Sequence, residues 1–187
     1  MADNRARGDV ARLTGLVRDV PDFPVPGVLF KDITPILSDP SAMSDAVSAM
    51  SEPWRRSEVD LVVGIEARGF ILGAPVAQAL GVGFIPVRKP GKLPGDILSE
   101  SYGLEYGQDS VEIHSDALPA HSRVVIIDDV LATGGTAAAT ARLVKASGAE
   151  LVGFGFLIDL VFLNGRSRLG GATVHAVMSF GEGQGAD

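Results

Sequence analysis

The feature that most constrains the fold is a series of short, unbroken runs of apolar β-forming residues, which alternate with alanine-rich helical stretches. A strand that is apolar at every position has to be covered on both faces, which is typical of a parallel sheet with helices on both sides. The sequence therefore predicts an α/β fold: a doubly wound, mainly parallel five-stranded sheet with its ligand at the carboxyl ends of the strands. The expected strands are 60–65, 82–88, 123–129, 150–159 and 173–180, and the expected helices are 41–56, 70–80, 136–147 and a short one at 165–169.

Two proline-rich segments interrupt this alternation. Within residues 20–37 the prolines forbid a continuous helix, so we interpret the region from about 12 to 37 as a hood above the ligand site. Residues 88–109 combine several glycines and prolines with clustered charges. Loops of this length are uncommon in compact domains unless they have a function, and we interpret this one as a flexible lid.

Length and composition exclude several classes of protein. The 187 residues contain no linker or internal repeat, so one domain spanning 1–187 is expected, with residues 1–9 loose and the tail 181–187 disordered. A net charge of −7 argues against binding to nucleic acid, which requires a basic face. The absence of cysteine excludes disulfides and thiolate chemistry and fits a cytoplasmic protein. We expect neither a signal peptide nor a membrane span, because the apolar run 70–87 is broken by prolines and glycines.

The segment VVIIDDVLATGGT, residues 124–136, carries the strongest functional signal. It places two acidic residues at the end of a strand, and then a glycine turn that opens a helix. Glycines let backbone N–H groups approach an anion closely, and the helix N-terminus adds positive potential. We predict that a phosphate is held by Ala132, Thr133, Gly134, Gly135 and Thr136.

The acidic pair, Asp128 and Asp129, would repel that phosphate and must therefore meet something else. Carboxylates accept hydrogen bonds from neighbouring sugar hydroxyls, and they stabilise positive charge on a ribose carbon directly or through a metal. The pattern thus describes a site for a ribose 5-phosphate. The alternative is an ordinary turn whose acidic residues cap the next helix. Neither the P-loop pattern nor the dinucleotide-binding glycine pattern occurs in the chain.

The same segment resembles the ribosyl-phosphate signature of the type I phosphoribosyltransferases. Within that family, residues 20–180 resemble the adenine phosphoribosyltransferases in five further segments: DFPVPGVLFKDITPIL, GIEARGFILGAPVA, VRKPGKLP, SYGLEYG and EIHSDAL. Departures are small: Lys31 stands where many members have Arg, and Glu66-Ala67 replaces a common Asp-Ser pair. The resemblance implies the type I phosphoribosyltransferase fold and a purine-salvage reaction, in which adenine and 5-phosphoribosyl 1-diphosphate give AMP and diphosphate.

The resemblance also implies a cofactor and an assembly. Mg²⁺ is expected to be held mainly by the substrate diphosphate, ribose hydroxyls and water, with no dedicated metal site in the protein. The expected partners are the two small-molecule substrates and a second copy of the chain in a homodimer.

Roles for individual residues follow from the same resemblance. Glu105 is the candidate general acid or base near the purine N7, and Arg68 is the second catalytic candidate. The turn with Glu66, Ala67, Arg68 and Gly69, and the lid residues Arg88 and Lys92, are expected to bind the diphosphate. In the family a cis peptide would join Glu66 and Ala67. Lys89 and Tyr106 belong to the lid, while adenine is expected to meet the backbone of Leu29 and Lys31 and to stack on Phe30.

Several alternatives stay open at this point. Arg68 could form a surface salt bridge, Phe30 could be ordinary core packing, and the basic residues of the lid could be a solvated charge run. The chain could also be a regulator that binds a nucleotide without catalysis, or a transferase for a 6-oxo purine. A signalling receiver domain, which also uses a strand ending in two aspartates, is excluded because that strand comes first in such domains.

Overall fold

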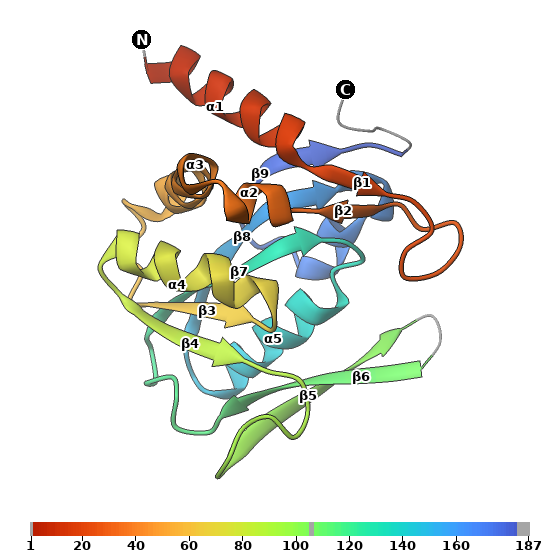
Figure 1. Ribbon diagram of the computed structural model, residues 1–187. Coiled ribbons are helices and arrows are strands. Elements are labelled where there is room, and N and C mark those ends of the chain that lie inside the picture. The colour runs from red at the N-terminus through yellow and green to blue at the C-terminus, as the bar shows by residue number, and fades with distance from the viewer. Residues whose placement is uncertain (1, 105–106, 183–187) are drawn as a thin grey trace.

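The structure, a computed structural model, describes residues 2–104 and 107–182, and its centre is a five-stranded sheet (Figure 1). The strand order is β4-β3-β7-β8-β9, and every neighbouring pair is parallel. This confirms the predicted fold class. The strands are β3 (Leu61–Ile65), β4 (Gly83–Val87), β7 (Arg123–Leu131), β8 (Glu150–Leu160) and β9 (Val174–Phe180).

Helices cover both faces of the sheet, as the unbroken apolar strands predicted. In β7, Val125 and Ile127 belong to the core under α3 and α4, whereas Val124 and Ile126 belong to the core under α5. All four side chains are fully buried. The helices are α1 (Ala2–Leu16), α3 (Pro40–Ser51), α4 (Arg68–Leu80) and α5 (Gly135–Ala146).

Local signals explain where these helices begin and end. The Asp39 side chain caps α3 by accepting the N–H of Ala42 at 2.8 Å. Gly81 and Gly148, which follow α4 and α5, have φ values of +75° and +78°, and a glycine tolerates this left-handed conformation best.

The predicted hood contains a second, small sheet, seen beside the carboxyl end of β9 in Figure 1. Strands β1 (Arg18–Val20) and β2 (Phe30–Asp32) pair antiparallel, and the short helix α2 (Thr34–Ser38) follows them. A cis peptide bond precedes Pro24 in the loop between the strands.

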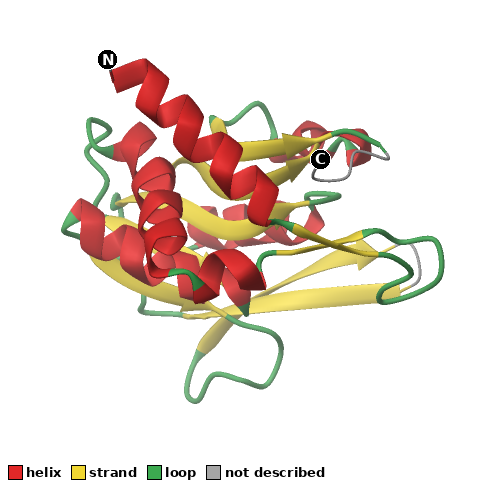
Figure 2. Ribbon diagram, turned by 45° about the horizontal axis from the view of Figure 1, so that its top comes forward, coloured by secondary structure: helices red, strands yellow, loops and turns green. Residues whose placement is uncertain are grey.

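Three expectations differ from the structure. Residues 2–9 lie in α1 rather than in a loose segment, and α3 ends at Ser51, where a 3₁₀ turn (Glu52–Trp54) takes over. The expected lid loop is in large part an antiparallel hairpin of β5 (Ile97–Leu104) and β6 (Gly107–His114), which extends away from the sheet in Figure 2. Within the described part of the chain, no helix has the length and apolar character needed to cross a membrane.

Candidate functional site

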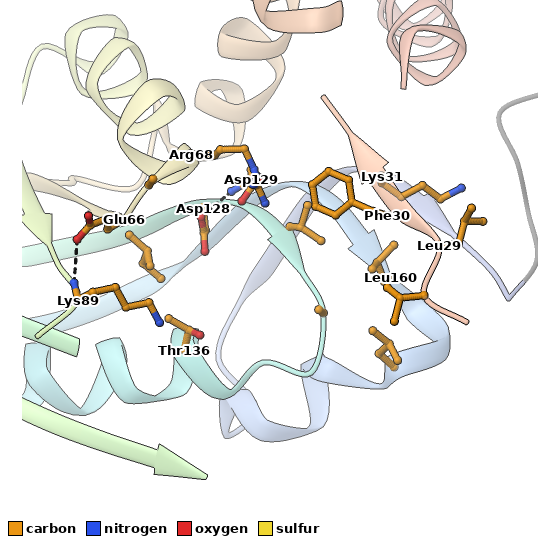
Figure 3. A pocket seen from close by; sticks show the side chains of 16 residues that line it. Leu29, Phe30, Lys31, Glu66, Arg68, Lys89, Asp128, Asp129, Thr136 and Leu160 are labelled. Carbon is orange, nitrogen blue, oxygen red and sulfur yellow. Dashed lines mark hydrogen bonds and ion pairs between the residues drawn. The ribbon is translucent and has the colours of Figure 1, made fainter. Parts of the chain in front are cut away.

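A cavity of about 410 Å³ opens at the carboxyl ends of β3 and β7 (Figure 3). Five parts of the chain line it: the hood strand β2 with the residues before it, the β3–α4 turn, Lys89 after β4, the end of β7 with the turn that follows, and the end of β8 with the next 3₁₀ turn, η2 (Val161–Leu163). This is the edge at which a doubly wound sheet is expected to bind its ligand.

The acidic pair lies at the centre of the cavity (Figure 3). Asp129 is 5% exposed, and its backbone N–H donates to Asp128 Oδ1 at 2.9 Å. Burial, and then repulsion from the Asp129 carboxylate, raises the pKa of Asp128 well above its usual range. Such a carboxyl group favours partners that donate hydrogen bonds over partners that carry negative charge.

Arg68, at the start of α4, approaches the acidic pair from the β3–α4 turn. Its Nε forms an ion pair with Asp129 Oδ2, and its guanidinium carbon lies 5.4 Å from the centre of the Phe30 ring. The salt bridge that was one alternative for Arg68 therefore exists, but it lies inside the cavity. With 43% of its side chain exposed, Arg68 retains a face that a ligand can reach.

The turn between β7 and α5 is shaped by backbone rather than by side chains. Gly134 is the N-cap of α5 with φ +77°. An ideal Cβ on Gly134 would lie only 2.4 Å from the carbonyl oxygen of Gly165, so a larger residue cannot fit without moving the chain. The first N–H groups of a helix have no partner within the helix, which leaves this turn with donors for an anion.

Tyr102 of β5 connects the hairpin to this turn. Its hydroxyl accepts hydrogen bonds from Thr136 Oγ1 at 3.0 Å and from Lys89 Nζ at 2.8 Å, and it donates one to Asp109 Oδ2 at 2.8 Å. Burial acts to lower the pKa of Lys89, but the hydrogen bonds with Asp109 and Tyr102 outweigh it and raise that pKa. Lys89 is thus a fixed cation, and its side chain extends toward Thr136 in Figure 3.

Glu66 links the β3–α4 turn to the start of the predicted lid. Its Oε2 accepts the backbone N–H of Lys89 at 2.9 Å, and the guanidinium of Arg88 donates to both carboxylate oxygens at 3.3 Å (Figure 3 shows the first contact). The hydrogen bond from Lys89, with a further contribution from Arg88, lowers the pKa of Glu66 against the opposing effect of burial. The bond between Glu66 and Ala67 is cis, which confirms what the resemblance implied.

The hood strand forms the apolar wall of the cavity. The Phe30 ring meets Phe23 edge-on, with ring centres 5.2 Å apart. Lys31 Nζ binds Asp19 Oδ1 at 2.6 Å and lies 4.5 Å from the centre of the Phe180 ring, while only 3% of the Lys31 side chain is exposed. The charged group of Lys31 is therefore engaged elsewhere, and its backbone remains to line the cavity.

The two carboxylates fit a metal that is shared with a substrate. Across residues 2–104 and 107–182, no three His, Cys, Asp or Glu side chains are grouped so that they could hold a metal ion. Magnesium is usually held by one or two carboxylates, with water and substrate phosphates completing its octahedron. Asp128 and Asp129 offer oxygen donors of this kind.

The cavity brings together most of the residues that were predicted to form the site. These are Leu29, Phe30, Lys31, Glu66, Ala67, Arg68, Lys89, Asp128, Asp129, Ala132 and Thr136. The turn between Ala132 and Thr136 is completed by Thr133, Gly134 and Gly135, which do not line the cavity themselves.

The other predicted residues lie apart from the cavity. Gly69 packs behind it, where a Cβ would meet Asp128 Oδ1 at 2.8 Å. Arg88 faces Glu66, and Lys92 is exposed and offers its carbonyl to Arg88 at 3.2 Å. Glu105 and Tyr106 lie outside the described residues.

Five lining residues were missed from the sequence: Val28, Ile65, Val130, Leu160 and Leu163. Three of them are direct neighbours of predicted site residues. Leu160 and Leu163 come from the end of β8 and the turn after it, a region that the rule for doubly wound sheets would have indicated, because β8 is adjacent to β7.

Comparison with known proteins gives a consistent result. Residues 37–168 match the family model described as "Phosphoribosyl transferase domain". The adenine phosphoribosyltransferase of Myxococcus xanthus (strain DK1622) is 58% identical over 171 residues, which cover 91% of this chain and 93% of the relative.

Solved structures agree with the sequence relatives. The crystal structure of adenine phosphoribosyltransferase from Rhodothermus marinus DSM 4252 is 52% identical, has a TM-score of 0.90, and matches over 93% of this chain and 99% of the other. The enzyme from Saccharomyces cerevisiae, complexed with D-2,5-dideoxy-2,5-imino-altritol 1,6-bisphosphate and adenine, is 42% identical with a TM-score of 0.87, over 91% and 99% of the two chains. The chain therefore belongs to the phosphoribosyl transferase family and, within it, to the adenine phosphoribosyltransferases.

Proposed function

We propose that the cavity at the ends of β3 and β7 is the place where adenine and 5-phosphoribosyl 1-diphosphate react to give AMP and diphosphate. The observation that supports this most strongly is the position of the acidic pair, between a backbone-built turn at the start of α5 and the β3–α4 turn with Arg68. During transfer, positive charge develops on the ribose while diphosphate leaves with negative charge. A site that accelerates this step has to stabilise both charges at once.

The ribose 5-phosphate end of the substrate occupies the β7–α5 side of the cavity. The N–H groups of the turn from Ala132 to Thr136 bind the 5′-phosphate, and Asp128 and Asp129 accept hydrogen bonds from two ribose hydroxyls. Because Asp129 is paired with Arg68, the ribose replaces Arg68 as its partner when substrate binds. The guanidinium is then free to bind the diphosphate through two parallel hydrogen bonds.

The leaving diphosphate lies against the β3–α4 turn. The Ala67 backbone N–H and the Arg68 guanidinium bind it, whereas the backbone N–H of Glu66 already donates to the Val87 carbonyl oxygen at 2.9 Å. Gly69 keeps the turn close to Asp128, and closure of the lid brings Arg88 and Lys92 toward the diphosphate. Lys89 and Tyr106 hold the lid over the substrates. The carboxylate of Glu66 supports this arrangement, since it holds the start of the lid in place by binding both Arg88 and the backbone of Lys89.

Adenine lies against the hood. Its N6 donor and N1 acceptor require a C=O and an N–H side by side, which the backbone of Leu29 and Lys31 can supply in an extended strand. Phe30 stacks on the adenine ring; in the structure the Arg68 guanidinium lies over the Phe30 ring, which is consistent with a face that can receive a flat partner. Glu105 acts as the general acid or base near N7.

Magnesium, the oligomeric state and the location complete the proposal. Asp128 or Asp129 would help to hold Mg²⁺ together with substrate oxygens and water, and the ion would neutralise charge on the leaving diphosphate. The protein is a cytoplasmic homodimer. The exposed side chains of Val161 and Phe162, at 49% and 45%, offer apolar surface for a second copy.

An assay of base selectivity tests the proposed function. With 5-phosphoribosyl 1-diphosphate and Mg²⁺, we expect AMP from adenine, and rates at least about 100-fold lower from hypoxanthine and guanine, because a 6-oxo purine would place donor against donor at the hood backbone. Equal rates with hypoxanthine would identify a 6-oxo purine transferase instead. Product from none of the three bases would identify a regulator that binds the nucleotide without catalysis.

A further inference from the structure

The turn that is proposed to bind the 5′-phosphate is supported from behind by another backbone segment. An ideal Cβ on Gly165 would lie 2.2 Å from the carbonyl oxygen of Ala132 and 3.1 Å from the backbone N of Gly134. A Cβ on Gly134 would lie 2.4 Å from the Gly165 carbonyl oxygen. The two segments therefore pack backbone against backbone, with the Leu131 side chain beside them, 3.0 Å from the same Cβ position. A small displacement of Gly165 must displace the turn as well.

Arg166, the next residue, determines where that supporting segment lies. It belongs to the 3₁₀ turn η3 (Gly165–Leu169). Its Nε donates to Asp159 Oδ2 at 2.6 Å, and its Nη1 donates to the carbonyl oxygen of Val174 at 3.1 Å. The Arg166 guanidinium thus links η3 to β8 and to β9. The planar fork of an arginine suits two acceptors held at fixed positions.

Asp159, the carboxylate partner of Arg166, is deeply buried. Its side chain is 1% exposed, although it lies one residue before Leu160, which lines the cavity. A buried carboxylate is costly unless it is paired and hydrogen-bonded. Among the contacts of the described residues, Arg166 supplies the ion pair for it. Neither residue lines the cavity, so we expect no direct contact with a bound substrate.

We propose that Arg166 and Asp159 are positioning residues for the 5′-phosphate. Their ion pair holds Gly165 in place, and Gly165 holds the turn from Ala132 to Gly135, so that the first N–H groups of α5 point at the phosphate. This inference rests on the proposed placement of the phosphate in that turn. It predicts a loss that is confined to ligands carrying a 5′-phosphate, whereas a pair that only stabilised the fold would affect every ligand alike.

Ligand affinities measured by calorimetry on Arg166→Met test this inference. We expect AMP to bind about tenfold more weakly than to the unsubstituted protein, because a displacement below 1 Å weakens several N–H···O contacts at once. Adenine affinity should stay within about twofold. With the unsubstituted protein, AMP binding at least about tenfold tighter than adenosine binding establishes separately that the 5′-phosphate is recognised.

Arg123→Met is the matched control. Like Arg166, Arg123 binds a carboxylate, that of Glu150, and backbone carbonyl oxygen, here of both Ser57 and Glu58, but it does so at the amino ends of the strands. The Arg123→Met substitution should lower the thermal midpoint of unfolding without changing AMP affinity. If Arg166→Met lowers the AMP and adenine affinities by the same factor, or leaves both unchanged, the inference is wrong.

Two milder variants decide the question even where Arg166→Met does not fold. Arg166→Lys keeps the charge opposite Asp159 but lacks the fork that also reaches Val174, so we expect AMP affinity to fall by about threefold. Asp159→Asn keeps an acceptor for Arg166 without the charge, and a similar loss is expected. AMP affinity at the level of the unsubstituted protein in both variants would overturn the proposal.

Discussion

Replacing Gly134 with alanine should reduce kcat/KM for 5-phosphoribosyl 1-diphosphate by about 100-fold, while the protein still folds. The added methyl group would meet the Gly165 carbonyl oxygen at 2.4 Å, and neither backbone segment has a flexible side chain that could move aside. The turn must shift, and the N–H groups proposed to bind the 5′-phosphate shift with it. A misplacement of about 1 Å in such a site typically costs about two orders of magnitude in rate.

Gly81→Ala separates this effect from ordinary backbone strain. Gly81 also has a positive φ, +75°, but a Cβ there would find nothing within 4 Å. Gly81→Ala should lower the free energy of unfolding by about 1–2 kcal/mol, the usual cost of a left-handed conformation, and Gly134→Ala should lower it by more because of the added clash. Only Gly134→Ala should lose activity. Steady-state rates for both variants check this, and a Gly134→Ala enzyme within about threefold of Gly81→Ala would show that the turn does not bind the phosphate.

Replacing Asp128 with asparagine should reduce kcat/KM by about 10- to 100-fold and at the same time stabilise the fold at neutral pH. The activity falls because a hydrogen bond from a ribose hydroxyl to a charged acceptor contributes about 1.5–3 kcal/mol, most of which a neutral amide loses. The fold becomes more stable because the substitution removes a buried negative charge next to Asp129. Steady-state rates and thermal unfolding of the same preparation measure both effects.

The pH dependence of unfolding shows whether the raised pKa of Asp128 is the cause. A carboxyl group with a raised pKa in the folded state stabilises the fold fully below its unfolded pKa, near 3.9, and loses that contribution as pH rises through the folded pKa. Asp128→Asn should therefore be more stable than the unsubstituted protein at neutral pH, and this advantage should disappear near pH 3.9. An advantage that is equal at all pH values would contradict the assignment.

Asp32 has a lowered pKa, in contrast to Asp128. The Thr34 hydroxyl, with help from the Thr34 N–H, lowers the pKa of Asp32 to about 2. Its contribution to stability is present above the unfolded pKa and is lost as pH falls toward 2. Asp32→Asn should therefore destabilise the fold at neutral pH. Opposite signs for the two Asp→Asn substitutions would link each effect to the local environment rather than to the change in net charge.

The sheet could be predicted from the sequence because its strands are buried on both faces. Each residue from Val124 to Ile127 lies in one of the two cores, so the apolar run carries the complete signal. The β5–β6 hairpin does not follow from the sequence pattern, because the glycines and prolines around it predict a loop. A weaker signal was present: Val111 and Ile113 are apolar residues at alternate positions with the polar Glu112 between them, a pattern that is typical of a strand.

The candidate site could be predicted from the sequence where consecutive residues form it. The turn after β7 is built from consecutive residues, so one segment of sequence identifies it. Tyr102 and Gly165 could not be found in this way. Tyr102 reaches Thr136 across 34 positions, and Gly165 supports the turn only because the connection after β8 folds back onto it. Such contacts depend on the tertiary structure and leave no local pattern.

A crystal structure of the protein with AMP tests the central claim most directly. We expect the 5′-phosphate within hydrogen-bonding distance of backbone N–H groups in residues 133–136, and the ribose hydroxyls on Asp128 and Asp129, with Arg68 released from its ion pair. A nucleotide bound elsewhere, with the Arg68–Asp129 pair intact and the turn at the start of α5 without phosphate, would contradict the account.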